Sequence, residues 1–228
     1  MIRSSCPAVL FSVLFLASSA FASSGELLNF QGLKDLQAVS NFYNGSGLGA
    51  TPNYGVTFTP NFLGLRSYAQ GGNGDFSPTP VLFTPAIFIS NGMTGAPGAA
   101  ITGVMNVGPG FSTGLNFFYT AGFAASQSET VTIWSGANGT GTVLATIALS
   151  NNNTGCSAPM YCNWSNAGLT FTGTAHSVTF TGPADEIGFS DITLGSSTTA
   201  VPEPSTIFFL ATGLVGMGIP RLRRFFRL

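Results

Sequence analysis

The ionisable side chains of this chain are few, and their positions limit the chemistry that they could perform. A Ser-His-Asp triad would have to use His176, the single histidine, which stands in a run typical of a strand and is expected at a strand edge. A paired-carboxylate mechanism needs two acids in one cleft, whereas adjacent Asp185 and Glu186 should point to opposite faces after a turn. The sequence therefore predicts a protein that is not an enzyme.

Cys156 and Cys162 are the two cysteines that follow the N-terminal leader. A metal or redox site is the weaker interpretation, because five residues rather than two separate them and the chain has one imidazole. We predict a disulfide that closes this short loop and persists in an oxidising exported compartment. Its closure should stabilise the fold by roughly 2 to 3 kcal/mol at most.

Three aromatic residues are candidates for a sugar-binding platform. Trp134 stands before a predicted turn, and Tyr161 and Trp164 flank the disulfide loop. Aromatic rings at loop ends can stack on sugar rings while their polar atoms stay hydrated. The alternative is that these rings belong to the core, as most aromatic residues of the chain should.

The elements that must position these residues are short strands. Alternating apolar runs are separated by glycine, asparagine, proline and threonine, a pattern typical of strands and turns. The clearest hairpin pairs 129–134 with 142–149 across Asn138-Gly139, which tolerate positive φ. Further strands are predicted at 55–59, 81–83, 87–89, 103–107, 114–122, 169–172, 175–181 and 186–194. Residues 29–43 show helix-like three-residue spacing, although their start could also form a first strand. The sequence predicts an all-β fold, a single jelly-roll-like β-sandwich.

The N-terminus has the pattern of a secretory signal peptide. Arg3 precedes an apolar segment at 8–17, and Ala20-Phe21-Ala22 is a small-x-small site suited to signal peptidase. We therefore predict a signal peptide over 1–22 and a sandwich body over 23–195.

The C-terminus combines a tether, a proline motif and a basic tail. Residues 196–204 are low in apolar content and end in Pro202, Glu203 and Pro204. Residues 205–228 hold an apolar run followed by four arginines, Arg221, Arg223, Arg224 and Arg227. Arginines are costly to move across a bilayer, so they should stay cytoplasmic and anchor one transmembrane helix. A run of about 14 residues rises only ~21 Å, so a buried core helix is the alternative unless snorkelling arginines bridge the missing length.

These three C-terminal parts, in this order, resemble the PEP-CTERM sorting signal of exopolysaccharide-producing Gram-negative bacteria. The resemblance covers about an eighth of the chain. It implies recognition by the membrane protease exosortase and export through the inner membrane with transient C-terminal anchoring. The final site would then be the cell surface or the extracellular space.

The body resembles the exported domain that precedes many such signals. It opens with a Phe-x-Gly-Leu strand at 29–33 and closes with Gly-Phe-x-Asp-Ile-x-Leu at 187–194. This closing strand is similar to that of galactose-binding-like jelly rolls, including carbohydrate-binding modules, which implies a structural calcium site at Gln31 and Asp191. Calcium prefers six to eight oxygens, whereas Asp191 is the one matching carboxylate, so a role in capping a turn is the alternative.

The charge balance restricts the partners of the body. Between the two predicted processing sites two bases, Lys34 and Arg66, stand against seven acids, for a net charge of −5. This balance argues against nucleic acid and anionic lipid surfaces. Two hypotheses remain: a non-catalytic structural protein of an exopolysaccharide-associated envelope, and a carbohydrate-binding module that retains exopolysaccharide. The lone histidine and sparse acids disfavour a secreted hydrolase.

Overall fold

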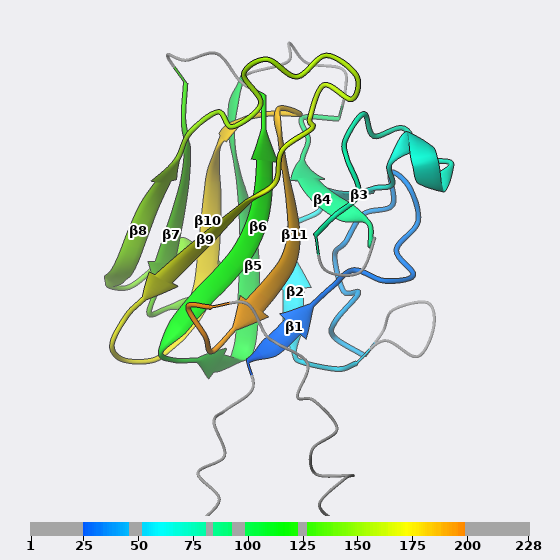
Figure 1. The fold of residues 1–228 in the computed structure, drawn as a ribbon. Helices are drawn as coiled ribbons and strands as arrows, with labels where there is room; N and C mark the ends of the chain where they lie inside the picture. Colours follow the sequence, from blue (N-terminus) through cyan, green and yellow to red (C-terminus); the bar gives the residue numbers. More distant parts are fainter. Residues whose placement is uncertain (1–24, 46–51, 81–83, 93–98, 123–126, 199–228) are drawn as a thin grey trace, which may run out of the picture.

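The protein is a sandwich of two antiparallel β-sheets (Figure 1). Its structure, a computed structural model, describes residues 25–45, 52–80, 84–92, 99–122 and 127–198. The predicted signal peptide, Pro-Glu-Pro motif, arginine-flanked helix and strand at 81–83 lie outside these residues. Among the residues described, we find no helix with the length and hydropathy of a membrane span.

One sheet has six strands. Its order is β3 (Phe62–Leu65), β4 (Ala86–Ile89), β11 (Ile187–Leu194), β6 (Gly114–Ala121) and β9 (Ser165–Thr170), with β1 (Glu26–Leu28) also paired to β11. β4 pairs with Gly188 and Phe189, whereas β1 pairs with the last three residues of β11. Because Glu26 lies opposite Leu194, β1 begins at the end of the sandwich where β11 ends, the lower end in Figure 1.

The second sheet has five strands and contains the predicted hairpin. Its order is β2 (Val56–Phe58), β5 (Ala100–Phe111), β10 (Ala175–Pro183), β7 (Glu129–Trp134) and β8 (Val143–Leu149). β7 and β8 pair antiparallel, and Asn138 and Gly139 between them have φ of 56° and 68°. The prediction of this hairpin and of its turn residues is confirmed.

Alternation along the strands places one face of each sheet in a shared apolar core. In β7, Val131 and Ile133 are fully buried, whereas the alternate residues Thr130 and Thr132 are half-buried. The ring of Phe180 on β10 makes edge-to-face contacts with two rings of the other sheet, Phe117 on β6 and Phe189 on β11. The all-β fold class is therefore confirmed as two packed sheets.

The helix-like reading of residues 29–43 is wrong. Phe30, Leu36 and Ser40 have φ of 56°, 56° and 37°, values that interrupt any right-handed helix. The segment instead makes successive turns, in which Leu33 donates to the carbonyl of Phe30 and Phe42 to that of Val39. Its three-residue apolar spacing arises because each turn directs one side chain into the core. Helical structure in the described residues is limited to the 3-10 turns η1 (Tyr68–Gln70) and η2 (Ala137–Gly139).

Candidate ligand-binding cavity

A cavity of about 560 Å³ lies on the outer face of the six-stranded sheet. Its floor comes from β4, β6 and β11, and its walls come from the loops 66–80 and 150–164. Ala86 and Phe88 point to this side because the alternate residues Ile87 and Ile89 fill the core. The lining residues are Leu36, Leu65, Asn73, Gly74, Asp75, Phe76, Ala86, Phe88, Thr120, Tyr161, Asp185, Ile187 and Gly188. The cavity therefore lies toward the start of β11, away from the end where β1 begins.

Backbone pairing joins the two loops that wall the cavity. Phe76 and Tyr161 form a parallel bridge, in which Tyr161 donates to the carbonyl of Asp75 at 3.0 Å and Ser77 donates to that of Tyr161 at 2.9 Å. The indole N–H of Trp164 donates to the Ser77 carbonyl at 2.9 Å. These bonds hold two distant segments of the sequence as one wall.

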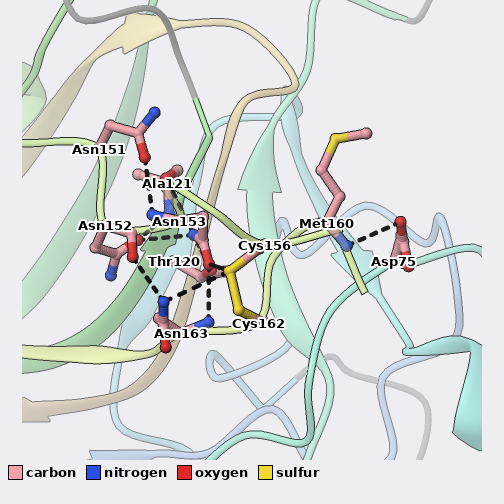
Figure 2. Close-up of a disulfide and its surroundings, with 10 residues drawn as sticks. All are labelled: Asp75, Thr120, Ala121, Asn151, Asn152, Asn153, Cys156, Met160, Cys162 and Asn163. Carbon is pink, nitrogen blue, oxygen red and sulfur yellow. Dashed lines mark hydrogen bonds between the residues drawn. A yellow bond between two sulfur atoms is a disulfide. The ribbon is translucent and has the colours of Figure 1, made fainter. Parts of the chain in front are cut away.

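The predicted disulfide between Cys156 and Cys162 is confirmed and closes the loop that carries Tyr161. Figure 2 shows amide side chains on one side of this bond, with Met160 and Asp75 on the other. The Met160 N–H donates to Asp75 Oδ2 at 3.1 Å, which ties the disulfide loop to the cavity wall.

Two asparagines fix the same loop to the end of β6. Asn153 is 7% exposed, donates to Thr120 Oγ1 at 2.8 Å and accepts from the Asn163 N–H at 2.8 Å. Asn152 accepts from the Ala121 N–H at 2.8 Å, as a neighbouring strand would. The loop is therefore held by both the disulfide and a buried amide network, which favours a preformed cavity.

Tyr161 stands among three carboxylates at the cavity. Its hydroxyl donates to Glu186 Oε2 at 3.3 Å. Burial raises the pKa of Tyr161 well above its usual range, and the nearby Glu186, Asp185 and Asp75 raise it further. The ring also packs over Gly122, where an added Cβ would lie 2.8 Å from it. Tyr161 is thus a neutral donor with a fixed ring.

Asp185 lines the cavity from the turn that precedes β11. Its φ is 64°, a conformation that aspartate tolerates, and its N–H donates to the Ile89 carbonyl at 2.9 Å. Among the residues that the structure describes, its buried Oδ1 has no hydrogen-bond partner. An apolar cavity with aromatic walls and carboxylate acceptors suits a ligand with apolar faces and several hydroxyl groups.

The structure brings together two of the three predicted platform aromatics. Tyr161 lines the cavity, and Trp164 lies behind it, edge-to-face with Phe76 at 5.7 Å and close to Gly188. Trp134 belongs to the other sheet, where its indole N–H donates to Thr179 Oγ1 at 3.0 Å. The remaining lining residues were missed, because they come together only when the two loops meet.

The two predicted calcium ligands differ in exposure. Asp191 is 1% exposed and accepts from the Ser190 hydroxyl at 3.0 Å, at a φ of 52°. Gln31 is exposed in the turn after β1. The described residues contain no group of three or more His, Cys, Asp or Glu side chains able to hold a metal ion. Calcium at these positions would have one carboxylate and remains a prediction.

His176 is the second residue of β10. β10 is the central strand of its sheet, and His176 sits at a bulge near its start. Ser112 stands in a Gly-x-Ser-x-Gly spacing at 110–114, which is also found in nucleophile elbows. That motif requires a strand-to-helix turn, whereas Ser112 lies between the antiparallel strands β5 and β6.

Glu129 is a buried acid that sequence reasoning missed. It is 0% exposed, and neither carboxylate oxygen has a hydrogen-bond partner within the described part of the chain. Burial raises the pKa of Glu129 from 4.5 to about 8. The alternation of apolar and polar residues along β7 could have predicted this burial. It places Glu129 on the same inward face as Val131 and Ile133.

The C-terminal segment outside the described residues has a recognisable sequence. Residues 200–224 match the model of the PEP-CTERM protein-sorting motif. The chain carries a PEP-CTERM motif. The motif implies processing by an exosortase and export to the surface with C-terminal anchoring. Search among curated proteins finds no match to the chain.

Several solved structures are similar to this chain at low sequence identity. The K2 cleaved adhesin domain of Lys-gingipain is 15% identical with a TM-score of 0.47, covering 76% of this chain and 99% of that one. The K1 domain, from Porphyromonas gingivalis W83, is 11% identical with a TM-score of 0.41, covering 76% and 98%. The C-terminal family 22 carbohydrate binding module of Clostridium thermocellum Xyn10B is 10% identical with a TM-score of 0.36, covering 76% and 100%. The fold assignment rests on the strand pairing of the chain itself.

Proposed function

We propose that this chain is an exosortase-sorted protein of the cell surface or extracellular matrix, whose body binds polysaccharide in the cavity without catalysis. The observation that carries the proposal is the cavity itself, with Phe76, Phe88 and Tyr161 among its lining and Asp75 and Asp185 as acceptors. Sugar rings offer apolar faces to aromatic groups and hydroxyls to carboxylates, so both parts of the lining have a matching partner in a glycan.

The position of the cavity also supports this function. It lies near the start of β11, whereas β1 begins beside the end of that strand. A ligand in the cavity would therefore be bound away from the end of the sandwich where β1 and β11 meet. That arrangement leaves a polymer free to pass the body of a tethered protein.

Glycan-array binding of the full-length chain in detergent tests the proposal. Asp185→Asn keeps a residue that tolerates positive φ but removes the carboxylate, and we expect binding to weaken at least about tenfold. Tyr161→Ala should do the same by removing the ring. Trp134→Ala on the other sheet is the matched aromatic control and should leave binding unchanged. Equal binding by all three variants would exclude the cavity.

A purely structural role is the second candidate, favoured by the rigid attachment of the loops rather than by the lining of the cavity. The disulfide and the Asn152 and Asn153 bonds would then serve stability alone. A glycan array with no ligand for the full-length chain would support this role.

Processing can be tested separately from binding. In a host that carries an exosortase, we expect the exported protein to lose everything beyond the Pro202–Pro204 region. Intact mass measures this directly, and retention of Phe225 and Phe226 would contradict it. Deletion of 221–228 should impair retention at the inner membrane, because the stop-transfer charge is removed.

A further inference from the structure

The two cationic side chains of the described residues line one hollow. Lys34 and Arg66 lie 32 positions apart in the sequence. Both contribute to a hollow of about 300 Å³, together with Gln31, Gly32, Leu33, Gln70, Thr84 and Pro85. Both side chains are exposed, and neither forms an ion pair with an acid among the described residues. The cationic hollow, as we name this site, therefore gathers the positive charge of a body with a net charge of −5.

The fold holds the backbone of both cations in place. Leu33, 2% exposed, anchors the turn, and the Lys34 N–H donates to Gln37 Oε1 at 3.0 Å. The Arg66 N–H donates to Asp35 Oδ1 at 2.8 Å. The other oxygen of Asp35 accepts from both the backbone and the side chain of Asn73. Both oxygens of Asp35, the acid next to Lys34 in the sequence, therefore accept hydrogen bonds from Arg66 N–H and from Asn73.

The cationic hollow adjoins the cavity along two short segments. Lys34 lines the hollow and Leu36 lines the cavity, with Asp35 between them in sequence. At the end of β3, Leu65 lines the cavity and the next residue, Arg66, lines the hollow. A polymer that occupied the cavity could thus extend to the hollow.

We propose that the cationic hollow binds the carboxylate of an acidic polysaccharide whose sugar rings enter the cavity. This inference rests on the proposed function of the cavity. A planar guanidinium matches a carboxylate with two hydrogen bonds, and a lysine adds a point charge beside it. The overall negative charge opposes diffuse attraction of polyanions, so recognition depends on local pairing in the hollow. The ligand class is a uronate-containing polymer, in which carboxylates and apolar ring faces alternate along one chain.

Affinity of the full-length chain for polygalacturonate tests this inference, with fully methyl-esterified polygalacturonate as the uncharged probe. We expect the acid polymer to bind more tightly, and its affinity to fall as salt is raised. The double variant K34Q/R66Q should bind the acid polymer at least about tenfold more weakly. The charge-keeping variant K34R/R66K should bind nearly as the unmodified chain does. The double variant A148E/T172E makes the same change in net charge at two exposed positions outside the hollow and should keep most of the binding.

The outcomes separate this inference from the proposed function. If K34Q/R66Q binds polygalacturonate as well as the unmodified chain, or A148E/T172E weakens binding equally, the hollow is not the subsite. Absence of polygalacturonate binding also overturns it, as does a preference for phosphatidylglycerol vesicles. In each case the proposed function still stands if neutral glycans bind and Asp185→Asn weakens that binding. Loss of the proposed function would instead show as equal neutral-glycan binding by the Asp185→Asn and unmodified chains.

Discussion

The two outer faces of the sandwich differ in their cover and in their charge. The face of the six-stranded sheet carries two joined loops, a cavity and the acids Asp75, Asp185 and Glu186 around Tyr161. The five strands of the other sheet contain one acid, Glu129, and its side chain is buried on the inward face of β7. Its outward positions are rich in threonine: Thr57, Thr102, Thr130, Thr132, Thr146, Thr179 and Thr181.

The two faces therefore suit different roles, one as a hydrated surface and the other as a site for a ligand. Threonine is a good strand former with a polar tip, so the threonine-rich face suits a hydrated sheet surface. Cross-strand bonds such as Thr102 Oγ1 to Thr181 Oγ1 at 2.9 Å link its side chains to one another. The other face places its polar groups on loops around a hollow, where the rigid sheet positions them for a ligand.

Glu129 is the acid of the otherwise uncharged sheet, and its substitution should give the largest change in stability. Its carboxyl is buried, and neither oxygen has a hydrogen-bond partner within the described residues. Its pKa is raised from 4.5 to about 8, so the folded state favours the protonated form. The stability that this preference contributes is fully present below pH 4.5 and is lost as pH rises toward 8. We expect Glu129→Gln to unfold with equal free energy at pH 4 but to be more stable at pH 8, by on the order of 4 kcal/mol.

Urea unfolding of both chains at several pH values measures this effect. Glu26→Gln removes a carboxylate at an exposed position on β1 and is the matched control for the change in charge. Parallel pH curves for Glu129→Gln and the unmodified chain would show that the buried carboxyl is not destabilising when ionised.

Loss of the disulfide should affect the loop-covered face. Replacing Cys156 and Cys162 by serine removes a short-loop closure, which costs about 2 kcal/mol in the chain-entropy model. We expect hydrogen exchange to become faster at Tyr161 and Asn163 than in β7 and β10, with weaker glycan binding, because the lost closure frees this loop locally in addition to lowering the global stability. If instead β7 and β10 lost protection first, the two faces would not be separable in this way.

The sequence could predict the strands but not the meeting of the loops. The β7–β8 hairpin shows local alternation and an Asn-Gly turn, and the disulfide joins cysteines close in sequence. The cavity instead depends on Met160 reaching Asp75, 85 positions away, a contact that no local pattern records. The turns of 29–43 were misread for a similar reason, because positive φ at Phe30 and Leu36 is set by tertiary packing rather than by residue type.

Two threonines give the smallest and most direct comparison of the faces. Thr120, 2% exposed beneath the loops, accepts from Asn153 Nδ2 at 2.8 Å, whereas half-exposed Thr132 on the other face bonds to Thr146 at 3.3 Å. We expect Thr120→Ala to cost about 1 kcal/mol, because it removes a buried partner, and Thr132→Ala to stay within about 0.5 kcal/mol. Urea midpoints at constant m-value measure both changes. Equal costs would mean that the loops add no order to the face that they cover, and the preformed cavity would lose its support.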